Sequence, residues 1–300
     1  MMKFDKFGDL FMRIKIHLSV LLILLGISSA LAQQDSVDYY MERGRMNYES
    51  GKKNQAINDF SRVIQLDPEV PAAYLHRGIA YGASANLKAA IEDFNKAITL
   101  DSQMRDAYYS RALAYEKNKE EAKAVLDYDQ AIKIDSNYAP AYYNRGILKF
   151  RQGLNADAIS DFQRTLKLRP NYDKAYLNLG HAYLAKGDTN WAEINYTKAL
   201  EVNPKYADAY YYRALVDYYS NKYDKAVADY TSATKLNPQF ANAYYGLGAT
   251  YEWLKKYDDA ISSLQMYLRL ATPADSARIK STKDKIDDIK RKQKEMETGK

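Results

Sequence analysis

The chain contains no cysteine among its 300 residues. This absence excludes disulfide bonds and lipid attachment through a cysteine. Only three histidines occur, His17, His76 and His181, and they are too scattered for a metal site built on His and Cys. The sequence also lacks a glycine-rich phosphate loop. We therefore expect no metal, no cofactor and no small-molecule substrate, and, since no nucleophile and base converge, no enzyme.

Glycine and proline are sparse as well, with 13 and 7 residues in a chain that is 47% hydrophobic. Such a composition favours helices around a sizeable core. The net charge of +6 lies mostly at the two ends, because residues 1–32 contribute +2 and residues 275–300 contribute +3. The remaining charge of +1 argues against a nucleic-acid groove, which needs clustered Lys and Arg.

A 34-residue period, free of insertions, runs through most of the sequence. Tyrosine occupies the fourth position of each unit: Tyr40, Tyr74, Tyr108, Tyr142, Tyr176, Tyr210 and Tyr244. The eighth position is always Gly or Ala, the twentieth is always Ala, and a large residue follows four positions later. Small residues allow two helices to approach closely, and the large residue lies on the same helical face as the alanine. A strict period of this length indicates units that bury their apolar faces against their neighbours.

Each unit is predicted to form two helices, because apolar and small residues recur at spacings of three and four on both sides of a polar break. Pro68, Pro170, Pro204 and Pro238 end the second helix in four of the units, since proline cannot continue a helix.

With the fourth-position tyrosine, the small site, the repeated alanine, the following aromatic and the terminal proline, the sequence resembles the tetratricopeptide repeat family. The resemblance implies an all-α fold, an α-solenoid in which helix-turn-helix units form a right-handed superhelix. A short leader at 33–36 precedes seven expected units, which are 37–70, 71–104, 105–138, 139–172, 173–206, 207–240 and 241–274. Residues 275–300 are expected to form a polar capping helix with a charged tail. Lys290 to Lys294 could instead touch acidic lipid or nucleic acid, although neighbouring acidic residues dilute their charge.

The N-terminus resembles a secretory signal peptide over residues 1–32. A basic start precedes a short apolar run from Leu18 to Ile27, and Ala30 and Ala32 form an Ala-x-Ala cleavage site. We expect cleavage after Ala32, export to the periplasm or the secreted space, and no stable membrane insertion afterwards. An uncleaved anchor is the alternative, but the run is short for a membrane span.

One polar pattern behaves like an internal covariation. Five units carry an arginine just before the small site and an aspartate sixteen residues later: Arg43 and Asp59, Arg77 and Asp93, Arg111 and Asp127, Arg145 and Asp161, Arg213 and Asp229. Units five and seven lose both residues together. We interpret these pairs as structural ion pairs between the two helices of one unit.

The family resemblance implies a concave surface, lined by the first helices, that binds protein or peptide. No unit carries the Lys and Asn that form a carboxylate clamp in related proteins. Aromatic residues are the predicted partner contacts in two places: Tyr109, Tyr143 and Phe150, and then Tyr211, Tyr218, Tyr219, Tyr245 and Trp253. Packing between helices is the alternative role for each of them. The sequence thus predicts a non-enzymatic protein-binding scaffold of the cell envelope or secreted space, and the alternative is a structural subunit of an envelope assembly.

Overall fold

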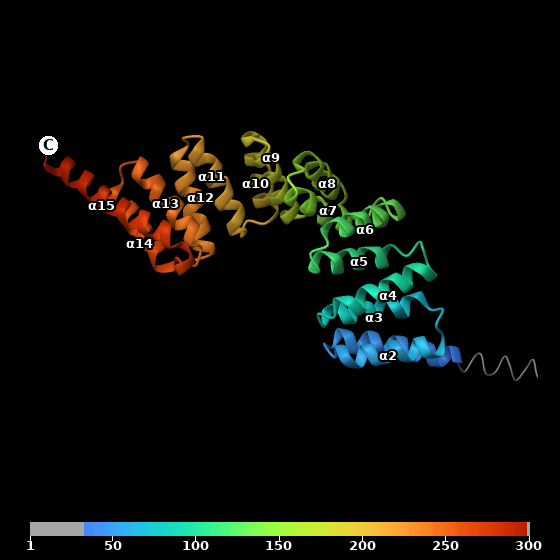
Figure 1. The fold of residues 1–300 in the computed structure, drawn as a ribbon. Coiled ribbons are helices and arrows are strands. Elements are labelled where there is room, and N and C mark those ends of the chain that lie inside the picture. Colours follow the sequence, from blue (N-terminus) through green and yellow to red (C-terminus); the bar gives the residue numbers. More distant parts are fainter. Residues whose placement is uncertain (1–32, 299–300) are drawn as a thin grey trace, which may run out of the picture. The chain divides into compact units, whose positions relative to one another are not determined.

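A computed structural model describes residues 33–298, and every secondary-structure element within that range is a helix (Figure 1). The described chain begins with helical residues 33–49. It continues through α2 (Lys53–Leu66), α3 (Pro71–Ala83), α4 (Leu87–Leu100), α5 (Arg105–Lys117), α6 (Glu121–Ile134), α7 (Ala139–Arg151), α8 (Asn155–Leu168), α9 (Asp173–Ala185), α10 (Thr189–Val202), α11 (Ala207–Tyr219), α12 (Tyr223–Leu236), α13 (Ala241–Trp253), α14 (Tyr257–Leu270), the short 3-10 helix η1 (Pro273–Asp275) and α15 (Ser276–Thr298).

The helices form tandem pairs, which makes the fold an all-α solenoid. From α3 to α14, each first helix has 13 residues and each second helix has 14. The predicted signal peptide lies outside the described residues.

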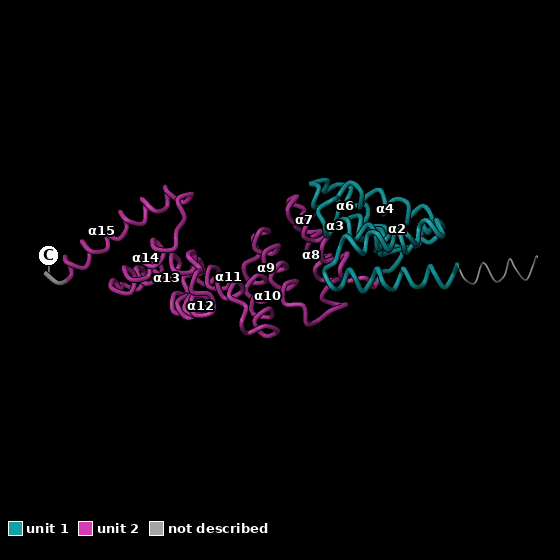
Figure 2. The backbone as a smooth tube through the Cα atoms, turned by 90° about the horizontal axis from the view of Figure 1, so that it is seen from below, with its two compact units in different colours: residues 1–136 teal, residues 137–300 magenta. Residues whose placement is uncertain are grey.

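The chain divides into two compact parts between α6 and α7 (Figure 2). We call residues up to Ser136 the N-terminal block and residues from Asn137 the C-terminal block. Each block contains complete helix pairs with its own core.

The small residues set the helix spacing within each pair. All seven alanines at the twentieth position are fully buried: Ala56, Ala90, Ala124, Ala158, Ala192, Ala226 and Ala260. At Gly180 a methyl group would lie 2.4 Å from the Tyr196 ring, which is closer than two carbon atoms can pack. The first helix therefore presents bare backbone to the ring of the second helix.

The break between the two helices of each unit has the same backbone conformation in all seven units. Its fifteenth residue has φ between 58° and 87°, in the left-handed region: Gly51, Ala85, Lys119, Gly153, Gly187, Asn221 and Lys255. Three of the seven are glycines, the residue that adopts this conformation without strain. The polar break in the sequence is thus a tight left-handed turn.

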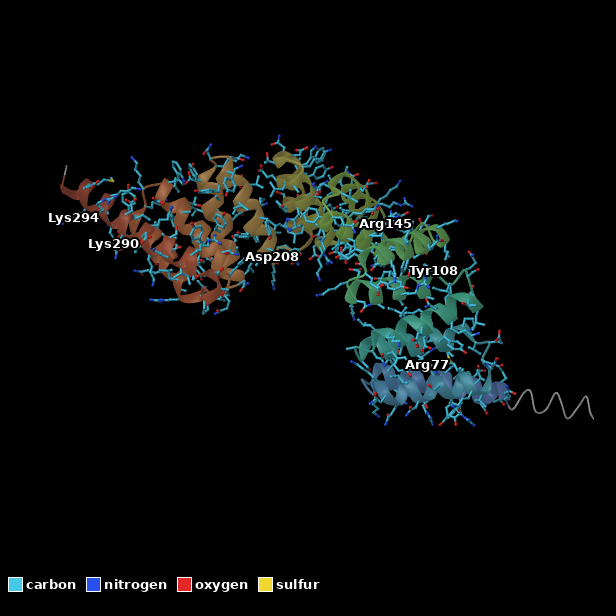
Figure 3. All side chains as sticks on the ribbon, viewed as in Figure 1. Arg77, Tyr108, Arg145, Asp208, Lys290 and Lys294 are labelled. Carbon is cyan, nitrogen blue, oxygen red and sulfur yellow. The ribbon has the colours of Figure 1, made fainter. Side chains whose placement is uncertain are left out.

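The helix α15 closes the C-terminal end of the solenoid. Its residues Thr282, Ile286 and Ile289 are buried, and both isoleucines join the cluster of Ala260 and Leu264. Met296, near the C-terminal end of α15, is exposed. The outer face of α15 is polar, with Lys290 and Lys294 exposed (Figure 3), as suits a cap.

Candidate functional site

The arginine and aspartate residues of the covarying pattern meet in all five units that carry them. In units two, three, four and six, the Nε and Nη2 atoms of the arginine donate to the two carboxylate oxygens at 2.5–2.9 Å. Arg43 donates to one oxygen of Asp59 through both Nε and Nη2. The carboxylates are buried and the guanidinium groups are partly exposed. This bidentate pairing links the two helices of one unit.

Three of these arginines also reach the preceding unit, a contact that the sequence pattern did not predict. The Nη1 atom of Arg77 donates to Ser61 Oγ at 3.1 Å, that of Arg111 to Asn95 Oδ1 at 2.6 Å, and that of Arg213 to Thr197 Oγ1 at 3.1 Å. Each acceptor lies sixteen residues before its arginine. Each of these arginines therefore connects the second helix of its own unit with the second helix of the preceding unit.

Units five and seven satisfy their polar groups in another way. The Asn195 side chain donates to the Trp191 carbonyl, and the Ser263 hydroxyl donates to the Asp259 carbonyl, so both residues bond within their own helix. Gln163, at the position of Ser61 and Asn95, donates to Tyr183 Oη at 3.0 Å. The loss of arginine is thus compensated without a buried unpaired charge.

Four of the predicted partner contacts pack inside their own block. Tyr109, Tyr143, Tyr211 and Tyr245 are half-buried, and each ring lies 5.3–6.1 Å from the core aromatic ring of its own unit. Tyr143 also packs on Tyr172, and Tyr211 packs on Phe240; each of these partners is the last residue of its unit and directly precedes the first helix of the next unit. Burial raises the pKa of Tyr143 and of Tyr211. Phe150 is likewise half-buried against the core of α8 and α9. These residues contribute to packing between helices.

The other three predicted contacts lie at the turn edge of the last two units. Tyr218 and Tyr219 end α11, and Trp253 ends α13. Trp253 is 62% exposed and Tyr219 is 75% exposed. The structure adds Tyr223, the first residue of α12, whose ring is parallel to that of Trp253. The predicted set thus separates into a packing group and an exposed edge group.

An apolar hollow opens on the first-helix side of the N-terminal block. It has a volume of about 270 Å³ and lies between α3 and α5, with Ile79 and Leu113 on its walls, Phe94 at its floor and Lys117 at its rim. Ile79 and Leu113 occupy equivalent positions in units two and three. The sequence contained this signal, because the corresponding residue is apolar in five of the seven units.

His181 has a structural role. Burial lowers the pKa of His181 to about 4, so the ring is neutral at neutral pH. Its Nδ1 atom lies 2.9 Å from Tyr196 Oη, and its ring packs against Tyr212. Within residues 33–298, no group of three or more His, Asp or Glu side chains is arranged to hold a metal ion.

Sequence models of the tetratricopeptide repeat match this chain over most of its length. One model, described as TPR repeat, matches residues 44–84, 122–153, 150–187 and 214–253. Three further tetratricopeptide repeat models match residues 71–104, 173–206 and 242–271. The chain belongs to the tetratricopeptide repeat family. The fold of this family is a scaffold consistent with protein–protein interaction.

Several solved structures of tetratricopeptide repeat (TPR) proteins resemble the chain. A crystal structure of MamA is 30% identical, and the match covers 55% of this chain and 96% of that chain with a TM-score of 0.52. A tetratricopeptide repeat protein from Parabacteroides merdae is 18% identical over 83% of this chain and 99% of its own, with a TM-score of 0.60. YrrB, whose structure is titled a TPR protein with an unusual peptide-binding site, is 23% identical over 60% and 93%, with a TM-score of 0.53.

No curated protein matched the sequence. Among the helices formed by residues 33–298, none combines the length and the apolar character needed to cross a membrane.

Proposed function

We propose that this chain is an exported, non-enzymatic scaffold that binds an extended peptide segment of a partner protein on its first-helix face. The observation that supports this function is the apolar hollow between α3 and α5. Its volume of about 270 Å³ is just below the roughly 300 Å³ at which sites for small molecules begin. It suits one or two apolar side chains of a peptide.

The walls of the hollow are suited to such a side chain. Ile79 and Leu113 are partly exposed although they are aliphatic, and Phe94 provides an aromatic floor. Covering them on binding removes apolar surface from water, worth about 25 cal/mol per Å² before the cost of ordering the peptide is subtracted. Lys117 at the rim and the hydroxyl of Ser110 provide polar contacts for a peptide backbone or a carboxylate.

Photocrosslinking in the native cell tests this function. A photoreactive amino acid replaces Leu113 in the hollow or, as a matched control, Leu126, which is 64% exposed on α6 in the same block. We expect a defined crosslinked partner from position 113 and none from position 126. Equal yields from both positions would contradict binding in the hollow. A partner that co-purifies in a fixed ratio and never dissociates would favour a structural subunit instead.

The export component has its own test. We propose cleavage after Ala32 from the Ala30-Leu31-Ala32 site and the apolar run before it. Terminal sequencing of the native protein should then begin at Gln33. A chain that keeps residues 18–27 and stays with the membrane after a high-salt wash would indicate an anchor.

A further inference from the structure

Aromatic residues concentrate at two repeat positions whose identity the fold leaves free. These positions are the last residue of the first helix and the first residue of the second helix. In units one to five they hold Glu49 and Lys53, Ala83 and Leu87, Lys117 and Glu121, Arg151 and Asn155, and Ala185 and Thr189. In units six and seven they hold Tyr219 and Tyr223, and Trp253 and Tyr257. Since none of the ten residues at these positions in the other five units is aromatic, the solenoid itself does not require these four aromatic residues.

Three of these residues, Tyr219, Tyr223 and Trp253, form one connected cluster with Tyr218 in the C-terminal block. The rings of Trp253 and Tyr223 are stacked, with centroids 5.7 Å apart and an interplanar angle of 7°. Trp253 Nε1 donates to Tyr218 Oη at 2.9 Å, and the Tyr218 ring lies 5.3 Å from that of Tyr219. These contacts hold Trp253 in one orientation while more than half of it stays exposed. A fixed, exposed tryptophan gives a large contact area at a small entropy cost.

Lysines from two elements border this cluster. A cleft of about 360 Å³ beside Trp253 is lined by Lys255 from the turn and by Lys285 and Lys292 from α15, with Glu252 as its one carboxylate. Lys285 and Lys292 pair with Glu252 at 2.5 and 3.1 Å. Three lysines and one glutamate leave this cleft with a positive charge. Among the described residues, Lys255 has no ion-pair partner within reach.

We propose that this edge, formed by Tyr218, Tyr219, Tyr223, Trp253 and Lys255, binds a short acidic peptide segment that carries one aromatic side chain. The aromatic side chain stacks on Trp253, and flanking carboxylates pair with Lys255 and Lys285. The site is separate from the apolar hollow, which lies in the other block, and it does not depend on the function proposed for that hollow.

A peptide suits the local charges better than a nucleic acid does. Glu252 lies in the cleft, and Asp288, which pairs with Lys292 at 2.8 Å, lies beside it. These carboxylates repel a continuous chain of phosphates, which needs an uninterrupted basic track. A segment with a few carboxylates can place them at Lys255 and Lys285 and avoid Glu252.

The test uses the purified protein and the pentapeptide acetyl-DEFED-amide, with binding measured by calorimetry. Two control peptides separate the contributions: acetyl-KKFKK-amide reverses the charge, and acetyl-DEGED-amide removes the aromatic anchor. We expect the acidic aromatic peptide to bind more tightly than either control, and its affinity to fall as salt is added. An oligothymidine of matched length tests the nucleic-acid alternative.

Two substitutions assign the binding to this edge without disturbing the fold. Trp253→Ala introduces the residue found at the same position in units two and five, and it should weaken binding about tenfold or more. Lys255→Gly introduces the glycine of units one, four and five, and it should weaken binding about threefold. Lys119→Gly changes a lysine with the same left-handed backbone in unit three, so it is a matched control that should have no effect.

Three outcomes would overturn the proposal. They are equal binding of all three peptides, tighter binding of the oligothymidine than of the acidic peptide, or unchanged affinity in Trp253→Ala with an unchanged melting temperature. None of these outcomes bears on the hollow, whose crosslinking is read out at position 113.

Discussion

Arg77 donates hydrogen bonds to both carboxylate oxygens of Asp93, at 2.8 and 2.7 Å, and its Nη1 atom donates to Ser61 of the preceding unit. The Asp93 side chain is 8% exposed and that of Arg77 is 20% exposed. Hydrogen bonding to Asp93 raises the pKa of the guanidinium further above its usual range, so the arginine stays charged. One arginine thus connects three helices of two units, and its loss affects both unit integrity and unit stacking.

Breaking this pair should be costly, whereas replacing it as a whole should not. Asp93→Ala leaves a partly buried guanidinium without its carboxylate, and we expect a loss of about 2 kcal/mol in unfolding free energy, below the value for fully buried pairs. The double variant Arg77→Leu with Asp93→Asn copies Leu179 and Asn195 of unit five and should recover most of that loss. Urea unfolding of Arg77→Leu, of Asp93→Asn and of the double variant gives the coupling energy. Additive losses would show that the pair is not coupled.

Asp217 is a buried carboxylate of unit six that lacks an adequate partner among the described residues. It is 2% exposed, its Oδ1 atom accepts no hydrogen bond, and its nearest cation, Lys222, is 3.5 Å away. The equivalent Asn47 of unit one donates to the partner aspartate Asp59 at 2.8 Å. Asp217→Asn should therefore stabilise the protein by about 1 kcal/mol, because it removes an under-satisfied buried charge. Asp161→Asn, which changes a buried aspartate that is fully paired with Arg145, is the control and should not stabilise.

The same residue predicts a pH dependence. Burial and the charge of Glu193, reinforced by Asp229, raise the pKa of Asp217 above its ordinary 3.8, against the opposing effect of Lys222 and Lys225. The folded state then binds more protons than the unfolded state between 3.8 and the raised value, so stability falls as the pH rises through that window. The advantage of Asp217→Asn should consequently be small near about pH 4 and larger and constant near about pH 7. A pH-independent advantage would mean that the folded state does not raise the pKa of Asp217.

The left-handed turns offer a stabilising change at an exposed site. Ala85 has φ 61°, where a Cβ costs about 1–2 kcal/mol, while the extra freedom of glycine in the unfolded chain costs about 0.4–1 kcal/mol. Ala85→Gly should thus stabilise by about 0.5 kcal/mol. Gly153→Ala should destabilise by a similar amount through strain alone, because its Cβ would meet no atom within 4 Å. Ala83→Gly, at the last residue of α3, is the control and should destabilise, because its backbone is helical and not left-handed. Thermal unfolding of all three variants checks the sign.

The sequence predicted the parts of this structure that repeat identically. The helix pairs and the meeting of Arg77 with Asp93 follow from residues that recur or vanish together. The hydrogen bond from Arg77 to Ser61 was not predicted, because the acceptor is Ser, Asn or Thr in different units. No single residue type therefore repeats at this position. The sequence did not separate the packing group from the exposed edge group, because Tyr245 and Trp253 are both aromatic residues of a first helix. Their packing distinguishes them, because α15 covers Tyr245, whereas Trp253 lies at a turn.

That difference between Tyr245 and Trp253 predicts opposite effects on stability. The Tyr245 ring lies 5.3 Å from that of Tyr267, and the Arg278 guanidinium of α15 lies 4.1 Å above it. Truncation at Tyr245 therefore opens a gap between α13, α14 and the cap, and we expect Tyr245→Ala to cost about 2 kcal/mol, less than for a fully buried aromatic residue.

Trp253→Ala should cost no more than about 0.5 kcal/mol, because most of the ring is exposed and other units carry alanine at this position. Urea unfolding of the two variants, followed by circular dichroism, measures the difference. Equal losses would place Trp253 in the packing group with Tyr245 and would remove the reason to regard the edge cluster as a surface kept for a partner. A large loss for Tyr245→Ala alone means that its effect on partner capture must be corrected for unfolded protein before it is interpreted as recognition.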